Sequence, residues 1–155
     1  SDFAGFHIKS SRGRGGVVRD VVVNNSVFLL QSVNHSGLVF SADMYYAGGG
    51  AFPRPTNASA TPQVHSIMLA NSRVHLLESS PRRLTPSFQF VGLPESPLLN
   101  FTFRNVAIVS GQWRGWSCEY TSGFLFENVT PAPNHTSNCT RLLETELGAA
   151  KMTMA

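Results

Sequence analysis

Alternating apolar and polar positions recur four times along the chain, and an asparagine follows each time at the same offset. Such period-two alternation is typical of a β-strand with one buried face. Asparagine tolerates left-handed backbone and hydrogen-bonds locally, so it suits a sharp bend between two short strands. The copies begin at Val21, Ile67, Phe101 and Phe124, and their asparagines are Asn25, Asn71, Asn105 and Asn128.

The recurrence predicts an all-β chain built as a solenoid, in which each coil stacks on the one before it. Stacked coils form parallel sheets, and the repeated asparagines can then make a ladder. Many short strands would also suit a sandwich or a barrel. The asparagines lie 46, 34 and 23 residues apart, so we expect loops of different length or a skipped coil. Further strands are expected at Phe6–Ile8, Leu38–Phe40 and Phe88–Val91.

Length and composition indicate one domain. The chain has 155 residues, of which 42% are hydrophobic and 14% are charged, so a packed core is feasible and global disorder is excluded. No apolar run approaches the roughly 20 residues that span a bilayer. We expect coils over residues 1–140, a tail over residues 141–155 with a weak helix signal at Arg141–Leu147, and a surface loop at Ala47–Pro62. The chain starts at Ser1 without a methionine, which favours a processed or excised segment.

Sequons and cysteines point to the secretory pathway. Two cysteines without a Cys-x-x-Cys motif argue against a cysteine zinc site. In a secreted chain they predict a Cys118–Cys139 disulfide, and in an intracellular chain they would be two buried thiols. The seven candidate glycosylation sites are Asn24, Asn34, Asn57, Asn100, Asn128, Asn134 and Asn138.

Four stretches of the chain, taken in order, carry a family resemblance. They are Gly5–Ser10 with the glycine-rich Gly13–Val21, Leu38–Phe40 with Tyr45-Tyr46, Phe90–Pro97 leading into Phe101–Val106, and Trp116–Gly123 with Pro131 and Cys139. Together they resemble glycoside hydrolase family 28, the polygalacturonases and their plant-type relatives, over about residues 5–140. The family's Arg-Ile-Lys motif corresponds to His7-Ile8-Lys9, with histidine in place of arginine.

The resemblance implies the C-terminal coils of a right-handed parallel β-helix from a secreted, cell-wall enzyme that hydrolyses pectic polysaccharide. The family's catalytic aspartates lie upstream of the Arg-Ile-Lys motif, and this chain has only Asp2, Asp20 and Asp43. Glycoside hydrolysis generally needs two carboxyl groups, so no catalytic residue is assigned and the isolated chain is expected to be inactive. Upstream coils of the same parent chain are the expected protein partner. The alternative is a non-catalytic glycan-binding or structural solenoid.

The best binding candidates are His7 and Lys9. Residues two apart in a strand point to the same face, so Phe6 and Ile8 should face the core. An ammonium is an effective partner for a uronate carboxylate. At neutral pH histidine is mostly uncharged and would bind a carboxylate less well than arginine does. In an acidic compartment it would become a cation and bind a carboxylate better than it does at neutral pH.

The remaining chemistry is sparse. Tyr45 or Tyr46 could stack on a sugar ring, and because the two are adjacent only one should face the groove. Lys9, Arg12, Arg14 and Arg19 form a basic stretch that suits a polyanionic glycan; one Arg-Gly-Gly copy is weak support for a nucleic-acid partner, which is not expected. Trp113 and Trp116 are expected to close the end of the core rather than to bind sugar. No metal, organic cofactor or membrane partner is expected.

Overall fold

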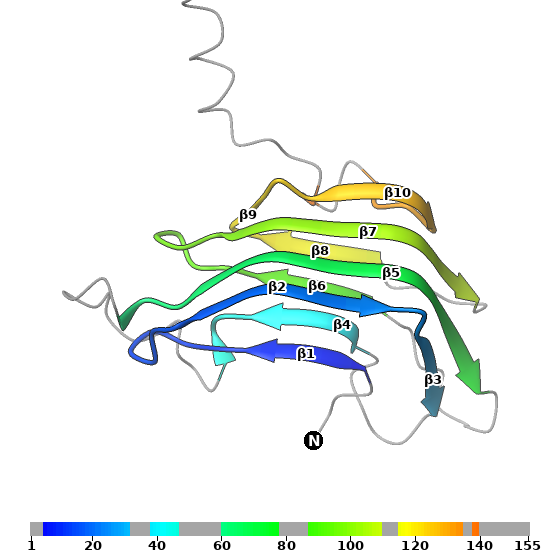
Figure 1. Cartoon of the computed structure of the whole chain (residues 1–155), viewed down its shortest axis with the longest axis horizontal. Coiled ribbons are helices and arrows are strands. Elements are labelled where there is room, and N and C mark those ends of the chain that lie inside the picture. The colour runs from blue at the N-terminus through cyan, green and yellow to red at the C-terminus, as the bar shows by residue number, and fades with distance from the viewer. Residues whose placement is uncertain are drawn as a thin grey trace, which may run out of the picture.

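The computed structural model describes residues 5–31, 38–46, 60–77, 87–109, 115–134 and 138–139, and these form two parallel β-sheets. Sheet A has the strand order β1-β4-β6-β8, and sheet B has the order β10-β7-β5-β2, with β3 paired to β5 and β9 to β7. In Figure 1 the two sheets lie as two layers, one behind the other. The strands are β1 Phe6–Lys9, β2 Val17–Asn24, β3 Val27–Gln31, β4 Leu38–Asp43, β5 Gln63–Leu77, β6 Ser87–Val91, β7 Leu98–Val109, β8 Gly115–Glu119, β9 Thr121–Ser122 and β10 Leu125–Thr130.

The chain passes alternately between the two sheets. We call one strand of sheet A, together with the sheet B strands that follow it, a rung; the four rungs are β1–β2–β3, β4–β5, β6–β7 and β8–β9–β10. Each rung pairs in parallel with the next in both sheets. All four copies of the repeat are therefore consecutive neighbours. Their unequal spacing comes from the connections between strands, and no rung lies between successive copies.

Left-handed residues bend sheet B at two aligned positions. The repeat asparagines Asn25, Asn71, Asn105 and Asn128 all have φ between 48° and 52° and make one column of bends, as the sequence predicts. A second column, which sequence analysis missed, consists of Asp20, Ser66, Asn100 and Gly123, with φ between 55° and 67°. Beyond the asparagine bends, β3 and the ends of β5 and β7 curve away together (Figure 1). Each long sheet B strand is thus a series of short straight segments.

Side-chain amides connect the asparagine bends. Asn128 Nδ2 donates to Asn105 Oδ1 at 3.0 Å, Asn105 Nδ2 to Asn71 Oδ1 at 2.9 Å, and Asn71 Nδ2 to Asn24 Oδ1 at 2.9 Å. The expected ladder is therefore present, with one correction. Its first member is Asn24 rather than Asn25, although Asn25 occupies the bend and donates its backbone N–H to the Ala70 carbonyl at 3.2 Å.

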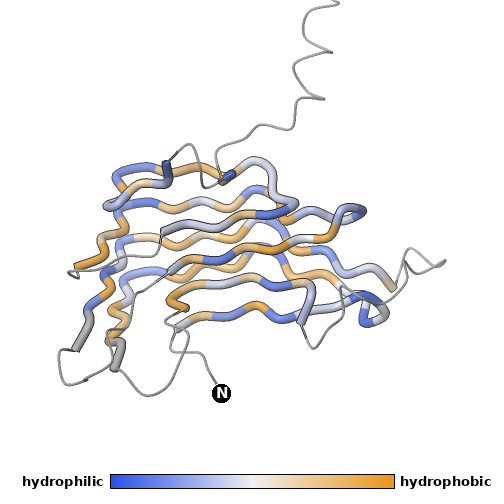
Figure 2. The backbone as a smooth tube through the Cα atoms, turned by 180° about the vertical axis from the view of Figure 1, so that it is seen from behind, coloured by the Kyte–Doolittle hydropathy of each residue, from blue (hydrophilic) through white to orange (hydrophobic). Residues whose placement is uncertain are grey.

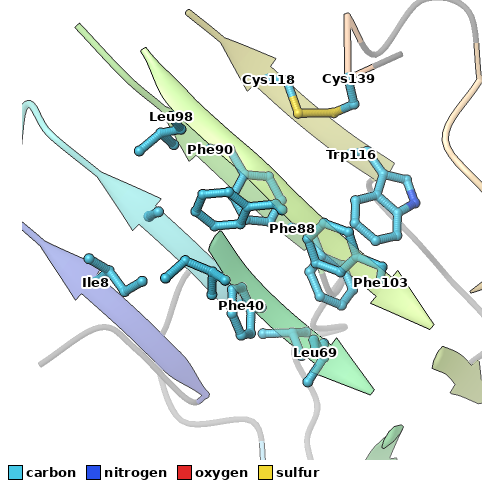
Figure 3. Packing of buried hydrophobic residues seen from close by; sticks show 14 of the residues in the cluster. Ile8, Phe40, Leu69, Phe88, Phe90, Leu98, Phe103, Trp116, Cys118 and Cys139 are labelled. Atoms are coloured by element: carbon cyan, nitrogen blue, oxygen red, sulfur yellow. A yellow bond between two sulfur atoms is a disulfide. The ribbon is translucent and has the colours of Figure 1, made fainter. Parts of the chain in front are cut away.

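The core lies between the sheets, and phenylalanine and tryptophan rings are its largest side chains (Figure 3). Alternation along the strands is visible in the hydropathy of the backbone (Figure 2), and it places one apolar set inside. Phe40, Phe88 and Phe103 are at most 1% exposed. Trp116 stacks on Phe88 with ring centroids 4.3 Å apart and donates its indole N–H to the Pro131 carbonyl at 2.9 Å. Trp116 therefore belongs to the core of the last rung, as expected.

A disulfide joins β8 to the segment after β10. Cys118 and Cys139 are bonded, with their Cα atoms 5.0 Å apart, as the sequence predicts for a secreted chain (Figure 3). Among the described residues, no helix has the length and apolar character that a membrane crossing requires. The expected helix at Arg141–Leu147, residues 47–59 of the expected loop, and Trp113 lie outside the described residues.

Candidate carbohydrate-binding face

The outward side chains of sheet A form two aligned columns. They are His7–Ser41–Gln89–Ser117 and Lys9–Asp43–Val91–Glu119. The inward columns between them, which begin with Phe6 and Ile8, belong to the core or pack against it. The predicted alternation of β1 is therefore correct, with Ile8 7% exposed and Phe6 half-buried.

Lys9 and Tyr46 meet at the end of β1. The Lys9 ammonium lies 4.4 Å from the centroid of the Tyr46 ring, over its face. Backbone bonds of Ser10 fix this approach: its N–H donates to the Asp43 carbonyl at 2.9 Å, and its carbonyl accepts from the Tyr46 N–H at 3.2 Å. Lys9 itself is exposed. A cation held over a tyrosine face, with its outer side open to solvent, can bind a carboxylate while the ring packs against a sugar.

His7 lies on the same face but is shielded. The edge of its ring meets Tyr46, with centroids 6.3 Å apart, and both ring nitrogens are inaccessible to solvent. Burial lowers the pKa of His7, and the charge of Lys9 lowers it further, while Asp43 acts in the opposite direction. The expected role of His7 as a direct substrate contact and acid-activated cation is therefore not supported by this geometry. Its ring supports Tyr46 instead.

Only one of the two adjacent tyrosines faces this site. Tyr45 packs against the core, and burial raises the pKa of its hydroxyl. Its backbone N–H donates to Asp43 Oδ1 at 2.7 Å, which fixes the start of the turn after β4. Tyr46 is thus the candidate ring, and Tyr45 is a structural residue.

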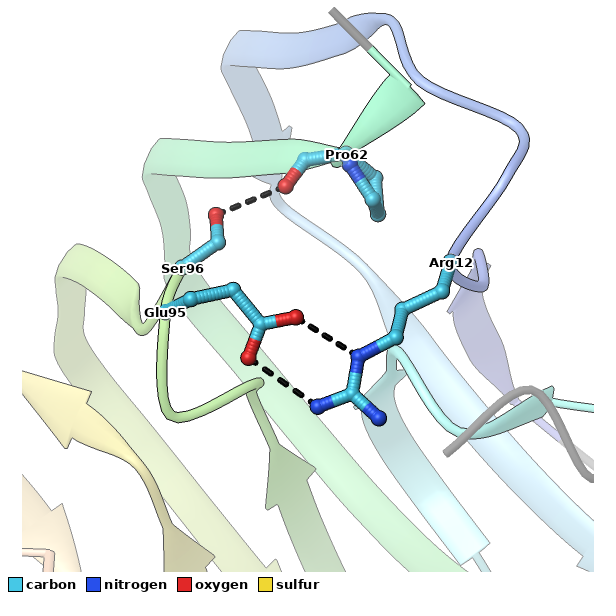
Figure 4. Close-up of polar contacts among 4 residues, drawn as sticks. All are labelled: Arg12, Pro62, Glu95 and Ser96. Carbon is cyan, nitrogen blue, oxygen red and sulfur yellow. Dashed lines mark hydrogen bonds and ion pairs between the residues drawn. The ribbon is translucent and has the colours of Figure 1, made fainter. Parts of the chain in front are cut away.

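The predicted basic stretch does not form a single patch. The Arg12 guanidinium binds both carboxylate oxygens of Glu95, at 2.6 and 3.0 Å, across the second rung (Figure 4). This pair is largely buried, with side chains 12% and 5% exposed, and it raises the pKa of Arg12. Arg19 lies on sheet B beside the exposed Asp20, 3.7 Å away, in a solvated pair. Lys9 is the member of the stretch that reaches the outer face of sheet A.

A hollow of about 320 Å³ continues the face toward the last rung. Its lining includes Gln89 and Ser117, both exposed, and the first residues of β4, β6 and β8, so it lies toward the starts of these strands. A second hollow of about 330 Å³ follows the asparagine ladder on sheet B. The amides in that second hollow already bind one another, and its lining also includes the exposed Arg73 and Thr130.

The described residues contain no group of three or more His, Cys, Asp or Glu side chains that could hold a metal ion. In the described part of the outer face of sheet A, the carboxylates are Asp43 on β4 and Glu119 on β8, and the strand between them contributes Val91. Asp2 lies outside the described residues.

The first rung leaves core side chains partly uncovered. Phe6, Val21 and Val23 are half-buried, whereas the residues aligned with them in the second rung are at most 1% exposed. Among the described strands, β1 and β2 each pair on one side only. This edge therefore exposes both apolar side chains and backbone hydrogen-bonding groups.

The structure gives several sequon asparagines a second role. All five described ones, Asn24, Asn100, Asn128, Asn134 and Asn138, are exposed, and Asn34 and Asn57 lie outside the described residues. Asn100, Asn128 and Asn138 have left-handed φ of 55°, 51° and 56°. Asn24 belongs to the amide ladder. Left-handed backbone thus favours asparagine at Asn100, Asn128 and Asn138, and a side-chain hydrogen bond does so at Asn24.

Comparison of the chain with protein-family models, with curated proteins and with solved structures finds no match.

Proposed function

We propose that this chain forms C-terminal coils of a right-handed parallel β-helix and supplies part of the substrate-binding groove of a secreted, pectin-directed glycoside hydrolase. The observation that carries the proposal is the exposed Lys9 ammonium held over the Tyr46 ring on the outer face of sheet A. This pair combines a cation for a uronate carboxylate with an aromatic surface for a sugar ring.

The β-helix is supported by the order of the strands. Parallel sheets whose strands alternate along the chain, with aligned bends and an amide ladder, are what a solenoid of stacked coils requires. The partly uncovered first rung favours further coils stacked on β1, β2 and β3. Such coils would bury Phe6, Val21 and Val23 and pair with the free strand edges.

Catalysis is assigned to residues outside this chain. The residues resembling the family's motifs here are those of the groove, and Asp20 is a solvated partner of Arg19. The second candidate function is a non-catalytic glycan-binding module, which the same Lys9–Tyr46 pair favours when no catalytic carboxylates accompany it.

Two measurements distinguish these functions. The purified chain should release no reducing ends from polygalacturonate under either reading, because a carboxylate pair that flanks a glycosidic bond is needed for turnover. Turnover by contaminant-free protein would contradict this and direct attention to Asp43 and Glu119. Activity of a longer chain that includes upstream coils would favour the hydrolase over the binding module.

Binding tests the groove itself. Lys9→Ala should weaken the affinity for uronate oligomers roughly tenfold, because a charge-assisted contact is lost. Fully methyl-esterified oligomers should lose much less, since they present no carboxylate. Arg73→Ala removes an equal charge from an exposed position on sheet B and should leave the affinity unchanged. Equal losses of affinity in the two variants would mean that the oligomers respond only to the net charge of the chain. The assignment of a binding site to Lys9 would then be wrong.

A further inference from the structure

The outer face of sheet A changes in charge from its first strand to its last. One aligned column has a cation on β1, a carboxylate on β4, an apolar side chain on β6 and a carboxylate on β8, namely Lys9, Asp43, Val91 and Glu119. Arg12, in the turn after β1, is bound by Glu95, and the exposed Arg14 lies in the same turn rather than in the outward columns of the sheet. In the described part of the face, positive charge is therefore concentrated at Lys9.

The strands farthest from Lys9 offer uncharged hydrogen-bonding groups. Gln89 and Ser117 are exposed and line the hollow of about 320 Å³. Amide, hydroxyl and carboxylate groups all accept hydrogen bonds from sugar hydroxyls. These groups suit a sugar unit, and none of them neutralises an anion.

We infer that the β6–β8 half of this face binds an uncharged sugar unit, while Lys9 binds a free uronate. The uncharged unit is either a neutral sugar or an esterified uronate. The preferred ligand is then a glycan of mixed charge. This inference rests on the proposed function and specifies its substrate.

The distance between Lys9 and Glu119, together with the charge of Glu119, explains why a second free uronate is disfavoured at the β6–β8 half of the face. Adjacent strands lie about 4.8 Å apart, so Lys9 and Glu119, three strand spacings from each other, are separated by roughly 14 Å along the face. That distance exceeds the Debye length of about 8 Å at physiological salt, so Lys9 does not compensate a ligand anion at Glu119. A second free carboxylate there would meet Glu119 and be repelled. An ester at the same place would instead contact Val91, which lies beside Glu119 on β6.

The test compares three uronate oligomers of equal length: fully de-esterified, fully methyl-esterified, and about half esterified. A fourth oligomer, with neutral sugar units between uronates, shows whether the uncharged unit is a neutral sugar or an esterified uronate. Binding to the intact chain is measured by calorimetry at low and at physiological salt. The half-esterified or the neutral-sugar oligomer should bind severalfold more tightly than either uniform oligomer.

Glu119→Gln is the decisive variant, with Asp20→Asn as its charge-matched control on sheet B. Glu119→Gln should raise the affinity for the de-esterified oligomer severalfold at low salt and change that for the mixed oligomers less than twofold. Asp20→Asn should change neither, and asparagine tolerates the left-handed φ of 57° there. Unfolding by urea checks that both variants are folded.

The outcomes separate the two claims. If Lys9→Ala leaves binding of every oligomer unchanged, or nothing binds, the proposed function fails and this inference fails with it. If Lys9→Ala weakens binding but the de-esterified oligomer binds best, or Glu119→Gln and Asp20→Asn act alike, only the inference about mixed charge is wrong.

Discussion

Replacement of Asn105 tests which property of the repeat asparagines stabilises the fold. Asn105 has a left-handed φ of 52°, and its amide donates to Asn71 and accepts from Asn128. Alanine at this position removes both hydrogen bonds and retains the unfavourable backbone conformation. Glycine removes the same hydrogen bonds but adopts a positive φ without strain.

The structure allows the two contributions to be estimated. Asn105 is exposed, so each lost hydrogen bond is replaced by water and should cost only about 0.5 kcal/mol. A left-handed alanine costs about 1–2 kcal/mol more. The expected loss for Asn105→Ala is therefore about 2–3 kcal/mol. Asn105→Gly should lose about 1.5–2 kcal/mol, from the same two bonds and the greater freedom of glycine in the unfolded chain.

Asn24 provides a matched control within the same ladder. It accepts one ladder bond from Asn71 and does not have a left-handed φ, so Asn24→Ala should lose only about 0.5 kcal/mol. Urea unfolding followed by tryptophan fluorescence measures all three variants, with an unchanged m-value as the condition for comparison. If Asn24→Ala costs as much as Asn105→Ala, or glycine costs more than alanine at Asn105, the amide ladder rather than the backbone bend dominates and the reasoning is refuted.

Two further substitutions and a pH series test other parts of the structure. Gly92→Ala should destabilise the chain by about 3 kcal/mol or more, because its Cβ would lie 2.2 Å from a backbone carbonyl oxygen; Gly13→Ala, with no atom within 4 Å but φ of 87°, should cost only the backbone strain of about 1–2 kcal/mol. Comparable urea midpoints for these two variants would contradict the close packing after β6. In the folded chain, burial and the charge of Lys9 lower the pKa of His7, although Asp43 acts in the opposite direction. The unfolded chain therefore binds a proton at His7 more readily than the folded chain does. The free energy of unfolding should decrease as the pH falls through about 6.5. In His7→Gln the urea midpoint should decrease less between pH 7.5 and 5.5 than it does in the unsubstituted chain. An unchanged pH dependence would contradict the burial of His7 described above.

Local patterns were sufficient for most of the strands and for part of the candidate site, but not for β8, β9 or the second column of bends. The alternation in Phe6-His7-Ile8-Lys9 determines which side chains share a face, because neighbouring residues of any strand point to opposite sides. The same rule at Tyr45-Tyr46 predicted that only one ring faces the groove. It could not predict which, since the choice depends on backbone bonds between Ser10 and the turn after β4.

Contacts between distant residues account for the differences. Arg12 belongs to a basic stretch in the sequence, but Glu95, 83 residues away, binds it in the fold. The ladder begins at Asn24 because side-chain direction at a bend depends on the neighbouring rung, and the repeat offset alone indicated Asn25.

The sequence by itself determined the all-β character, several of the strands and the asparagine bends, because each depends on residues close together in the chain: period-two alternation and asparagine in left-handed backbone. Tertiary structure alone decided that His7 is shielded, that Tyr46 rather than Tyr45 meets Lys9, and that Lys9, Asp43, Val91 and Glu119 form one column. Those properties depend on the register between strands and on burial, and both are fixed only when rungs separated by loops of different length stack on one another.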